Sequence, residues 1–171
     1  EQNEKITVKT NQTYYAITKK NVKAIFISNG ADTILNNSQN CSFYNNDGGC
    51  NVKTPDINRD DWIVLGWSTN KDATTANIKE KEEIKIKDNV KYYAITYYKV
   101  TATFHKNNAD SLGSCTNPQV NGCIETCNVY NTNKSCEIKL PHIYSEGNEV
   151  QFFSLGSDPT TTIGYSPAKK I

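Results

Sequence analysis

The sequence predicts a mainly β protein organised as two tandem repeats, and two observations lead to this prediction. Residues 14–18 and residues 92–96 both read YYAIT, which gives an offset of 78 residues. In addition, short segments rich in Val, Ile, Thr, Tyr and Phe alternate with clusters of Asn, Asp and Gly. This composition is typical of strands separated by turns.

The similarity between the repeats extends well beyond YYAIT. Residues 22–32 read VKAIFISNGAD and residues 100–110 read VTATFHKNNAD, again at an offset of 78. Further along the offset becomes 86, as Pro55 and Pro141 show, so the second repeat carries an insertion of 8 residues. Each repeat is therefore one structural unit of the chain.

The repeat boundaries predict how the chain is divided. We expect closing strands of a preceding repeat at 1–18, a full first repeat at 19–96, and a second repeat at 97–171 with its insertion near 115–123. The second repeat is expected to lack its last strand. Division at 1–78 and 79–171 is the alternative. The absence of Met fits an excerpt or a processed chain.

Alternating apolar and polar residues predict the strands, and one charged segment is the best helix candidate. The candidate, residues 72–83, lacks an apolar stripe at helical spacing, so we interpret it as a charged loop with one helical turn at most. The predicted strands lie at 5–10, 13–18, 22–28, 63–68, 83–87, 91–96 and 100–104.

Composition excludes some classes of partner. The net charge is +1 and the basic residues are scattered, so no surface for a nucleic acid or an anionic membrane is predicted. The chain contains no apolar run long enough for membrane insertion. Repeats of about 80 residues bury only a small core and are marginally stable without covalent help.

The six cysteines form three local pairs. Two pairs match each other at the offset of 86, and the third lies in the insertion. Each pair brackets a turn-like segment, so we predict cross-hairpin disulfides, each contributing on the order of 2–3 kcal/mol, and an oxidising compartment. Zinc binding is the rival interpretation, but no CxxC motif supports it. The predicted pairs are Cys41–Cys50, Cys115–Cys123 and Cys127–Cys136.

No catalytic, cofactor or metal site is predicted. His105 is expected to face solvent from its strand, and His142 follows Pro141 in a turn. Neither has an adjacent nucleophile and orienting acid in the sequence pattern. Residues 56–61 begin like a calcium loop, but Asp61 stands where such a loop needs Gly. We therefore predict a protein that is not an enzyme.

Aromatic residues are the candidates for core packing and for binding. Alternation along a strand separates the two rings of each Tyr pair. We expect Tyr15, Tyr93 and Trp67 in the core, and Tyr14, Tyr92, Tyr97 and Trp62 on the exposed face. The insertion is the other place for ligand contacts, because loops on a rigid scaffold carry function. The candidate binding residues are Tyr97, Trp62, Asn117, Gln119 and Asn121.

The motif Leu65-Gly66-Trp67, followed by a strand with Tyr93-Ala94, resembles the Listeria–Bacteroides repeat, the internalin-B type B-repeat of bacterial surface proteins. The second repeat departs from this pattern because Phe152-Phe153 replaces Gly-Trp, and the cysteines are also unusual, which suggests a divergent subgroup. The resemblance implies β-grasp-like α+β modules in tandem. Pattern alone leaves immunoglobulin-like β-sandwich repeats as the alternative.

The resemblance also implies an extracellular stalk or spacer on the cell surface or cell wall, without catalysis or cofactor. A host surface protein or a glycan is the expected partner, and neighbouring repeats could associate with one another. An adhesin module that binds through the 115–123 insertion is the alternative. An intramolecular isopeptide cross-link is a further possibility that the sequence leaves open.

Overall fold

The computed structural model describes residues 4–45, 47–149 and 153–154, and within these residues the chain forms strands and no helix. The prediction of a mainly β protein is confirmed. The strands are β1 (Lys19–Ile27), β2 (Ser38–Tyr44), β3 (Cys50–Lys53), β4 (Ile63–Ser68), β5 (Glu83–Ile86), β6 (Val90–His105), β7 (Ser111–Gly113), β8 (Asn117–Gln119), β9 (Gly122–Tyr130) and β10 (His142–Tyr144).

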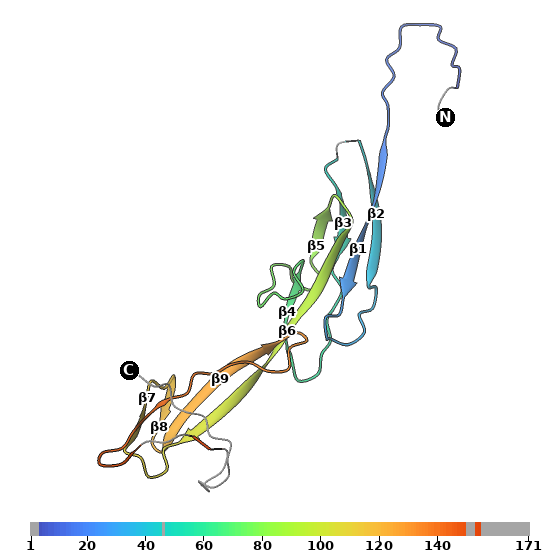
Figure 1. The fold of residues 1–171 in the computed structure, drawn as a ribbon. Helices are drawn as coiled ribbons and strands as arrows, with labels where there is room; N and C mark the ends of the chain where they lie inside the picture. Colours follow the sequence, from blue (N-terminus) through green and yellow to red (C-terminus); the bar gives the residue numbers. More distant parts are fainter. Residues whose placement is uncertain (1–3, 46, 150–152, 155–171) are drawn as a thin grey trace.

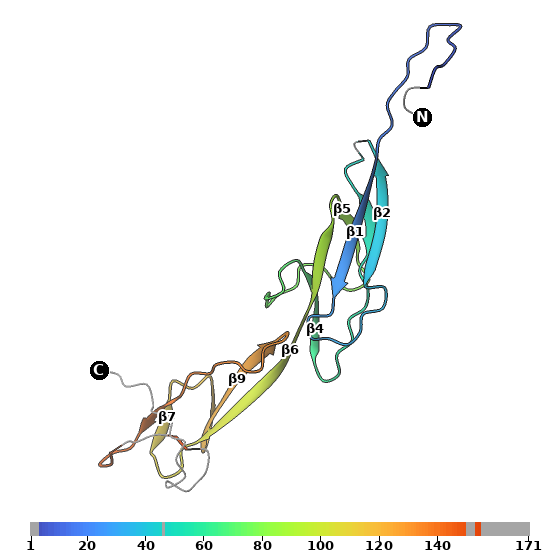
Figure 2. The same ribbon diagram turned by 45° about the vertical axis from the view of Figure 1, so that its right-hand side comes forward.

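One sheet runs the length of an elongated molecule (Figures 1 and 2). Its strand order is β2-β1-β6-β9-β8, and β4 also pairs with β6. All neighbours are antiparallel except β1 and β6, which are parallel over Ala24–Ile27 and Val90–Tyr93. Parallel neighbours need a long crossover. Here β2 to β5 make that connection.

Strand β6 crosses the predicted boundary between the repeats. It continues without a break across the boundary between Thr96 and Tyr97 and has 16 residues. Its first half pairs with β1 and β4, and its second half, from Tyr97 to His105, pairs with β9. The strand is rich in β-branched and aromatic residues and contains no Gly or Pro, so nothing in it interrupts the ladder.

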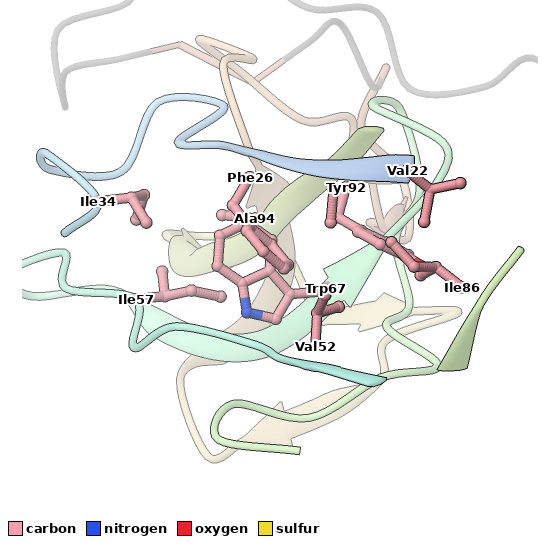
Figure 3. Packing of buried hydrophobic residues seen from close by; sticks show 10 residues of the cluster. Val22, Phe26, Ile34, Val52, Ile57, Trp67, Ile86, Tyr92 and Ala94 are labelled. Carbon is pink, nitrogen blue, oxygen red and sulfur yellow. The ribbon is translucent and has the colours of Figure 1, made fainter. Parts of the chain in front are cut away.

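The main hydrophobic core lies between residues 22 and 94 (Figure 3). Trp67 is fully buried at its centre, as predicted, and its indole N–H donates to the Pro55 carbonyl oxygen over 3.1 Å. Phe26 contacts Trp67 edge-on, with ring centroids 5.1 Å apart, and stacks on Tyr92 at 5.6 Å. The buried members are Val22, Ala24, Phe26, Ile34, Val52, Ile57, Trp67, Ile86, Tyr92 and Ala94.

The assignment of the Tyr92–Tyr93 pair to the two faces was wrong. Tyr92 lies in the core, where burial raises the pKa of its phenol, and Tyr93 is half-buried. Alternation separates the two rings but does not say which face is covered. The parallel neighbour β1 decides it, because Phe26 lies on the covered face beside Tyr92.

Gly66, the glycine of the Leu65-Gly66-Trp67 motif, lies at a β-bulge in β4. The register of β4 against β6 shifts between Val64 and Gly66, and Gly66 has φ of 126°. A Cβ atom there would lie 2.3 Å from the Ile78 carbonyl oxygen. Only glycine fits, because the backbone needs both a positive φ and this close approach.

All three predicted disulfide pairings are present, but their placement differs from simple hairpins. Cys41 lies on β2 of the large sheet, and Cys50 lies on β3, which pairs with β5 and with no other strand that the structure describes. This bridge therefore joins two sheets that share no strand. Cys127 lies on β9, and Cys136 lies in an irregular segment. Cys123 lies on β9, and Cys115 lies in the irregular segment just before β8, so this bridge closes the base of the β8–β9 hairpin.

Two predicted strands are absent. Residues 5–10 and 13–18 have no regular structure and are exposed, because no strand among the described residues lies beside them. Strand composition cannot stabilise an extended segment without a neighbour. Residues 72–83 contain no helix, in agreement with the loop prediction. His142 begins β10 rather than a turn and pairs with Gly113.

Strands that match each other in sequence pair in matching registers. Lys19 lies opposite Tyr44 in the β1–β2 pair, and Tyr97 lies opposite Tyr130 in the β6–β9 pair. These positions are related by the sequence offsets of 78 and 86. The edge-on contact of Phe26 with Trp67 has a counterpart at the same offsets, with the Phe104 and Phe153 rings 5.0 Å apart.

Candidate functional site: the junction between the repeats

A network of side-chain hydrogen bonds lies at the predicted boundary between the repeats. Here β6 leaves β4 and begins its pairing with β9, at Thr96 and Tyr97. Three parts of the chain meet at this point: the end of β9, the loop before β4, and the loop after β4. We call this site the junction and define it by Arg59, Lys71, Ala73, Thr96 and Asn131.

Asn131 is the centre of the junction. Its side-chain Oδ1 accepts from the Thr96 backbone N–H over 3.2 Å, and its Nδ2 donates to the carbonyl oxygens of Ala73 (3.0 Å) and Lys71 (3.3 Å). Asn131 is buried and has φ of 51°, a left-handed conformation that asparagine adopts more readily than most residues. One amide therefore fixes a strand of the first repeat, a loop of the first repeat and a turn of the second.

Arg59 closes the junction from the loop before β4. Its Nη1 donates to the Thr96 hydroxyl and to the Asn131 carbonyl oxygen, both over 2.8 Å. Its guanidinium carbon lies 3.1 Å from the centroid of the Trp62 ring, within the range of a cation–π contact. Burial lowers the pKa of Arg59, although Asp32 opposes this shift. Arg59 has no metal-binding role despite its place in the calcium-like segment, since guanidinium only donates.

Aromatic rings from β6, from β9 and from the loop before β4 flank the junction. Trp62 contacts Tyr98 edge-on with centroids 4.5 Å apart, and Tyr97 lies 5.4 Å from Tyr130. These rings are half-buried, whereas the sequence predicted Tyr97 and Trp62 to be exposed. Contacts with other residues of this chain therefore cover part of the surface of these rings.

The start of the first repeat has the same local hydrogen bonds. The Thr18 N–H donates to Asn45 Oδ1 over 3.0 Å, and the Asn45 N–H donates to the Thr18 carbonyl oxygen over 2.9 Å. Thr18 matches Thr96 at an offset of 78, and Asn45 matches Asn131 at 86. Asn45 is exposed and Asn131 is buried, because Arg59 and the loop after β4 cover only the latter.

The five predicted binding residues do not form one site. Trp62 and Tyr97 lie at the junction, and the other three lie in the β8–β9 hairpin. The hairpin is at the far end of β9, since Tyr97 pairs with Tyr130 whereas His105 pairs with Gly122. Eight residues of strand correspond to roughly 26 Å. The hairpin residues are Asn117, Gln119 and Asn121.

The β8–β9 hairpin is stapled and presents an apolar tip. The Cys115–Cys123 bridge spans it, and Val120 at the tip is 93% exposed. Glu125 accepts from the Thr116 backbone N–H over 2.6 Å, and this hydrogen bond lowers the pKa of the Glu125 carboxyl. Both sulfur atoms near Glu125 are joined to each other, so neither is a thiolate that could bind zinc.

The two histidines lie outside the junction. His105 ends β6 and is exposed, as predicted, while His142 on β10 lies with its ring centroid 6.4 Å from that of Tyr144.

Among the residues that the structure describes, no helix is long and apolar enough to cross a membrane.

Comparison with known proteins identifies no relative: no family model, no curated protein and no solved structure matches the chain. The resemblance to the B-repeat therefore rests on the sequence motifs alone.

The sequence patterns did not predict the junction. Arg59 lies in the calcium-like segment 56–61, and neither Thr96 nor Asn131 belongs to a recognisable motif. A signal was present, because Thr18 and Thr96 match at one offset and Asn45 and Asn131 at the other. Residues that recur at both repeat starts are candidates for a role in connecting repeats.

Proposed function

We propose that the chain is a disulfide-stapled spacer made of tandem repeats and belongs to the extracellular part of a bacterial surface protein. The observation that carries this proposal is the continuity of β6, which serves both repeats without a linker. A 16-residue strand spans roughly 50 Å at about 3.3 Å per residue. Repeats joined in this way extend the chain in one direction and resist bending at the joint.

The junction supports the same role. If the repeats were joined by a flexible segment, the boundary residues would be exposed and without partners from both sides. Thr96 is instead buried and bonded to Arg59 of the first repeat and to Asn131 of the second. The equivalent registers of the β1–β2 and β6–β9 pairs support division into repeats at 19–96 and 97–171.

The disulfides support an extracellular location. Three bridges in one chain indicate an oxidising environment, because cytosolic thiols are kept reduced. A surface location, with attachment to a cell wall, follows from the resemblance to the B-repeat and is part of the proposal. The finer fold assignment is also part of the proposal: the parallel pair β1–β6 favours β-grasp-like modules over immunoglobulin-like sandwiches, whose sheets are antiparallel, although the described residues contain no helix of the kind that an α+β module includes.

Rigidity at the junction is the property to test. Residual dipolar couplings of backbone amides in β1 and β9 report whether the two repeats tumble as one body. We expect one alignment tensor to fit both strands in the unmodified chain. Insertion of about eight Gly and Ser residues between Thr96 and Tyr97 should separate the couplings into two tensors, since a Gly/Ser segment is a flexible coil.

A matched control places the same insertion between Leu35 and Asn36, both exposed in the loop after β1. This variant should keep one tensor, because the loop is outside every strand. Two independent tensors in the unmodified chain would refute a rigid spacer.

A binding role for the β8–β9 hairpin is the second candidate. The observation that favours it is the exposure of Val120 at the tip of a turn closed by a disulfide. Because the disulfide already orders this turn, a ligand would bind the Val120 side chain without the entropic cost of ordering a loop. Replacing residues 117–121 by a short Gly-containing turn should abolish adhesion to host cells or glycans if this role is correct. Unchanged adhesion by a folded variant would exclude it.

A further inference from the structure

Strands β1 and β6 are parallel neighbours that the chain enters and leaves at opposite ends. The chain enters β1 at Lys19 and leaves β6 at His105, and the two strands pair over 24–27 and 90–93. Figures 1 and 2 show the start of β1 toward one end of the elongated molecule and the end of β6 toward the other. Tension along the chain therefore draws β1 and β6 past each other in the direction of the strands.

The direction of pulling decides how the bonds between two strands share a load. When parallel strands are pulled from opposite ends, all the hydrogen bonds between them are loaded together. When they are pulled from the same end, the bonds break one after another. The β1–β6 pair has four register positions, and the bonds of a parallel pair are evenly spaced. These bonds therefore raise the barrier to unfolding, which governs resistance to force.

Two side-chain contacts reinforce the pairing of β1 with β6. Asn89 Oδ1 accepts from the Lys23 backbone N–H over 2.8 Å, which extends the contact by one position. Phe26 on β1 stacks on Tyr92 on β6, with ring centroids 5.6 Å apart. Ala24, Phe26 and Tyr92 are buried, so water has little access to compete for the bonds between the strands. We call the paired residues and these two contacts the clamp.

Strand β6 also carries the load away from the clamp. From Tyr93 it continues through the junction to His105, so tension reaches the second repeat through the backbone of one strand. We propose that the clamp is the force-bearing element of the chain and keeps the first repeat folded when tension acts along it. This inference goes beyond the spacer role, because a rigid spacer need not resist tension.

The Cys41–Cys50 bridge provides a length by which unfolding of the first repeat can be recognised. Both cysteines lie between β1 and β6 in the chain. The bridge holds their Cα atoms 6.0 Å apart, whereas nine residue steps of extended chain span roughly 31 Å at about 3.5 Å per residue. The intact bridge therefore shortens the extension on unfolding by about 25 Å.

The test is single-molecule force spectroscopy on the full chain in two attachment geometries. Azide-bearing amino acids serve as attachment points, because added cysteines would compete for the disulfides. Attachment at Lys9 and Asn108 shears the clamp, whereas attachment at Lys9 and Lys87 pulls both strands from their starts. All three residues are exposed and lie outside the strands. We expect an unfolding force at least about twofold higher in the shearing geometry, because four register positions bear the load together.

A pair of matched substitutions locates the resistance. In the shearing geometry, Asn89→Ala should lower the unfolding force, because it removes the hydrogen bond to Lys23 between β1 and the start of β6. Asn51→Ala is the control. It removes a side-chain hydrogen bond of the same length, to Glu83 between β3 and β5, and should leave the force unchanged because this bond lies outside the clamp.

The double substitution Cys41→Ala with Cys50→Ala identifies the part that unfolds. It should lengthen the unfolding step in the shearing geometry by about 25 Å. Equal unfolding forces in the two geometries, or a step that does not lengthen in the cysteine variant, would overturn the proposal. The alignment-tensor measurement tests the rigid spacer separately, because it is made without tension. One tensor together with equal forces would retain the spacer role and exclude the clamp.

Discussion

The junction predicts that two matched asparagines contribute very differently to stability. Asn45 and Asn131 occupy equivalent positions, have φ of 48° and 51°, and each accepts from a threonine N–H. Replacing either by Ala imposes the same left-handed conformation on a residue that disfavours it, at a cost of roughly 1 kcal/mol. This cost therefore cancels when the two variants are compared.

The two variants should differ in free energy of unfolding because they remove different numbers of side-chain hydrogen bonds. Asn131→Ala removes three side-chain bonds, to Thr96, Lys71 and Ala73, while Asn45→Ala removes one, to Thr18. At about 0.5–1.5 kcal/mol per bond, two additional bonds correspond to about 1–3 kcal/mol. The value should lie toward the upper end, since the Thr96 N–H is buried and would be left unpaired.

Urea unfolding followed by tryptophan fluorescence measures this difference. Trp62 reports on the junction and Trp67 on the core. Asn131→Gly serves as a control for conformation, because glycine adopts positive φ freely but restores no side-chain bond. It should therefore recover only the conformational part of the loss. Equal losses of unfolding free energy in Asn45→Ala and Asn131→Ala, within about 0.5 kcal/mol, would refute the reasoning.

Three further predictions concern other parts of the molecule. Replacing Cys41 and Cys50 by Ala should lower the free energy of unfolding by about 2–3 kcal/mol in a urea titration, because the bridge closes a short loop between two sheets. Trp67→Phe should cost about 1–3 kcal/mol in the same titration, since it leaves space in the core and removes the indole hydrogen bond. The lowered pKa of Glu125 means that its carboxylate stabilises the β8–β9 hairpin above its ordinary value of 4.5, and that this contribution is lost as pH falls through the lowered pKa. The chemical shift of the Thr116 amide should report this transition below pH 4.5, and no change there would contradict it.

Local sequence predicted several elements well. Residues 63–68 are rich in β-branched and aromatic residues and form β4, and the cysteine spacing alone indicated the three pairings. Trp67 was correctly placed in the core. These properties depend on a few neighbouring residues, for which strand alternation and short loop closure are strong constraints.

The failures share one cause. Residues 5–10 and 13–18 have strand composition but are not strands, and Tyr92 rather than Tyr93 is buried. A strand exists only beside a neighbour, and the covered face depends on which neighbour that is. The residues of a segment alone do not specify its neighbouring strand or the face that this neighbour covers.

The sequence by itself determined the mainly β character and the cysteine pairs, because each is set by residue types at short spacing. Only the tertiary structure decided that β6 passes unbroken through both repeats, that Cys41 and Cys50 join separate sheets, and that Arg59 and Asn131 meet across the boundary. These contacts join residues that are distant in the chain. Their formation depends on the three-dimensional packing of whole strands, which no local pattern specifies.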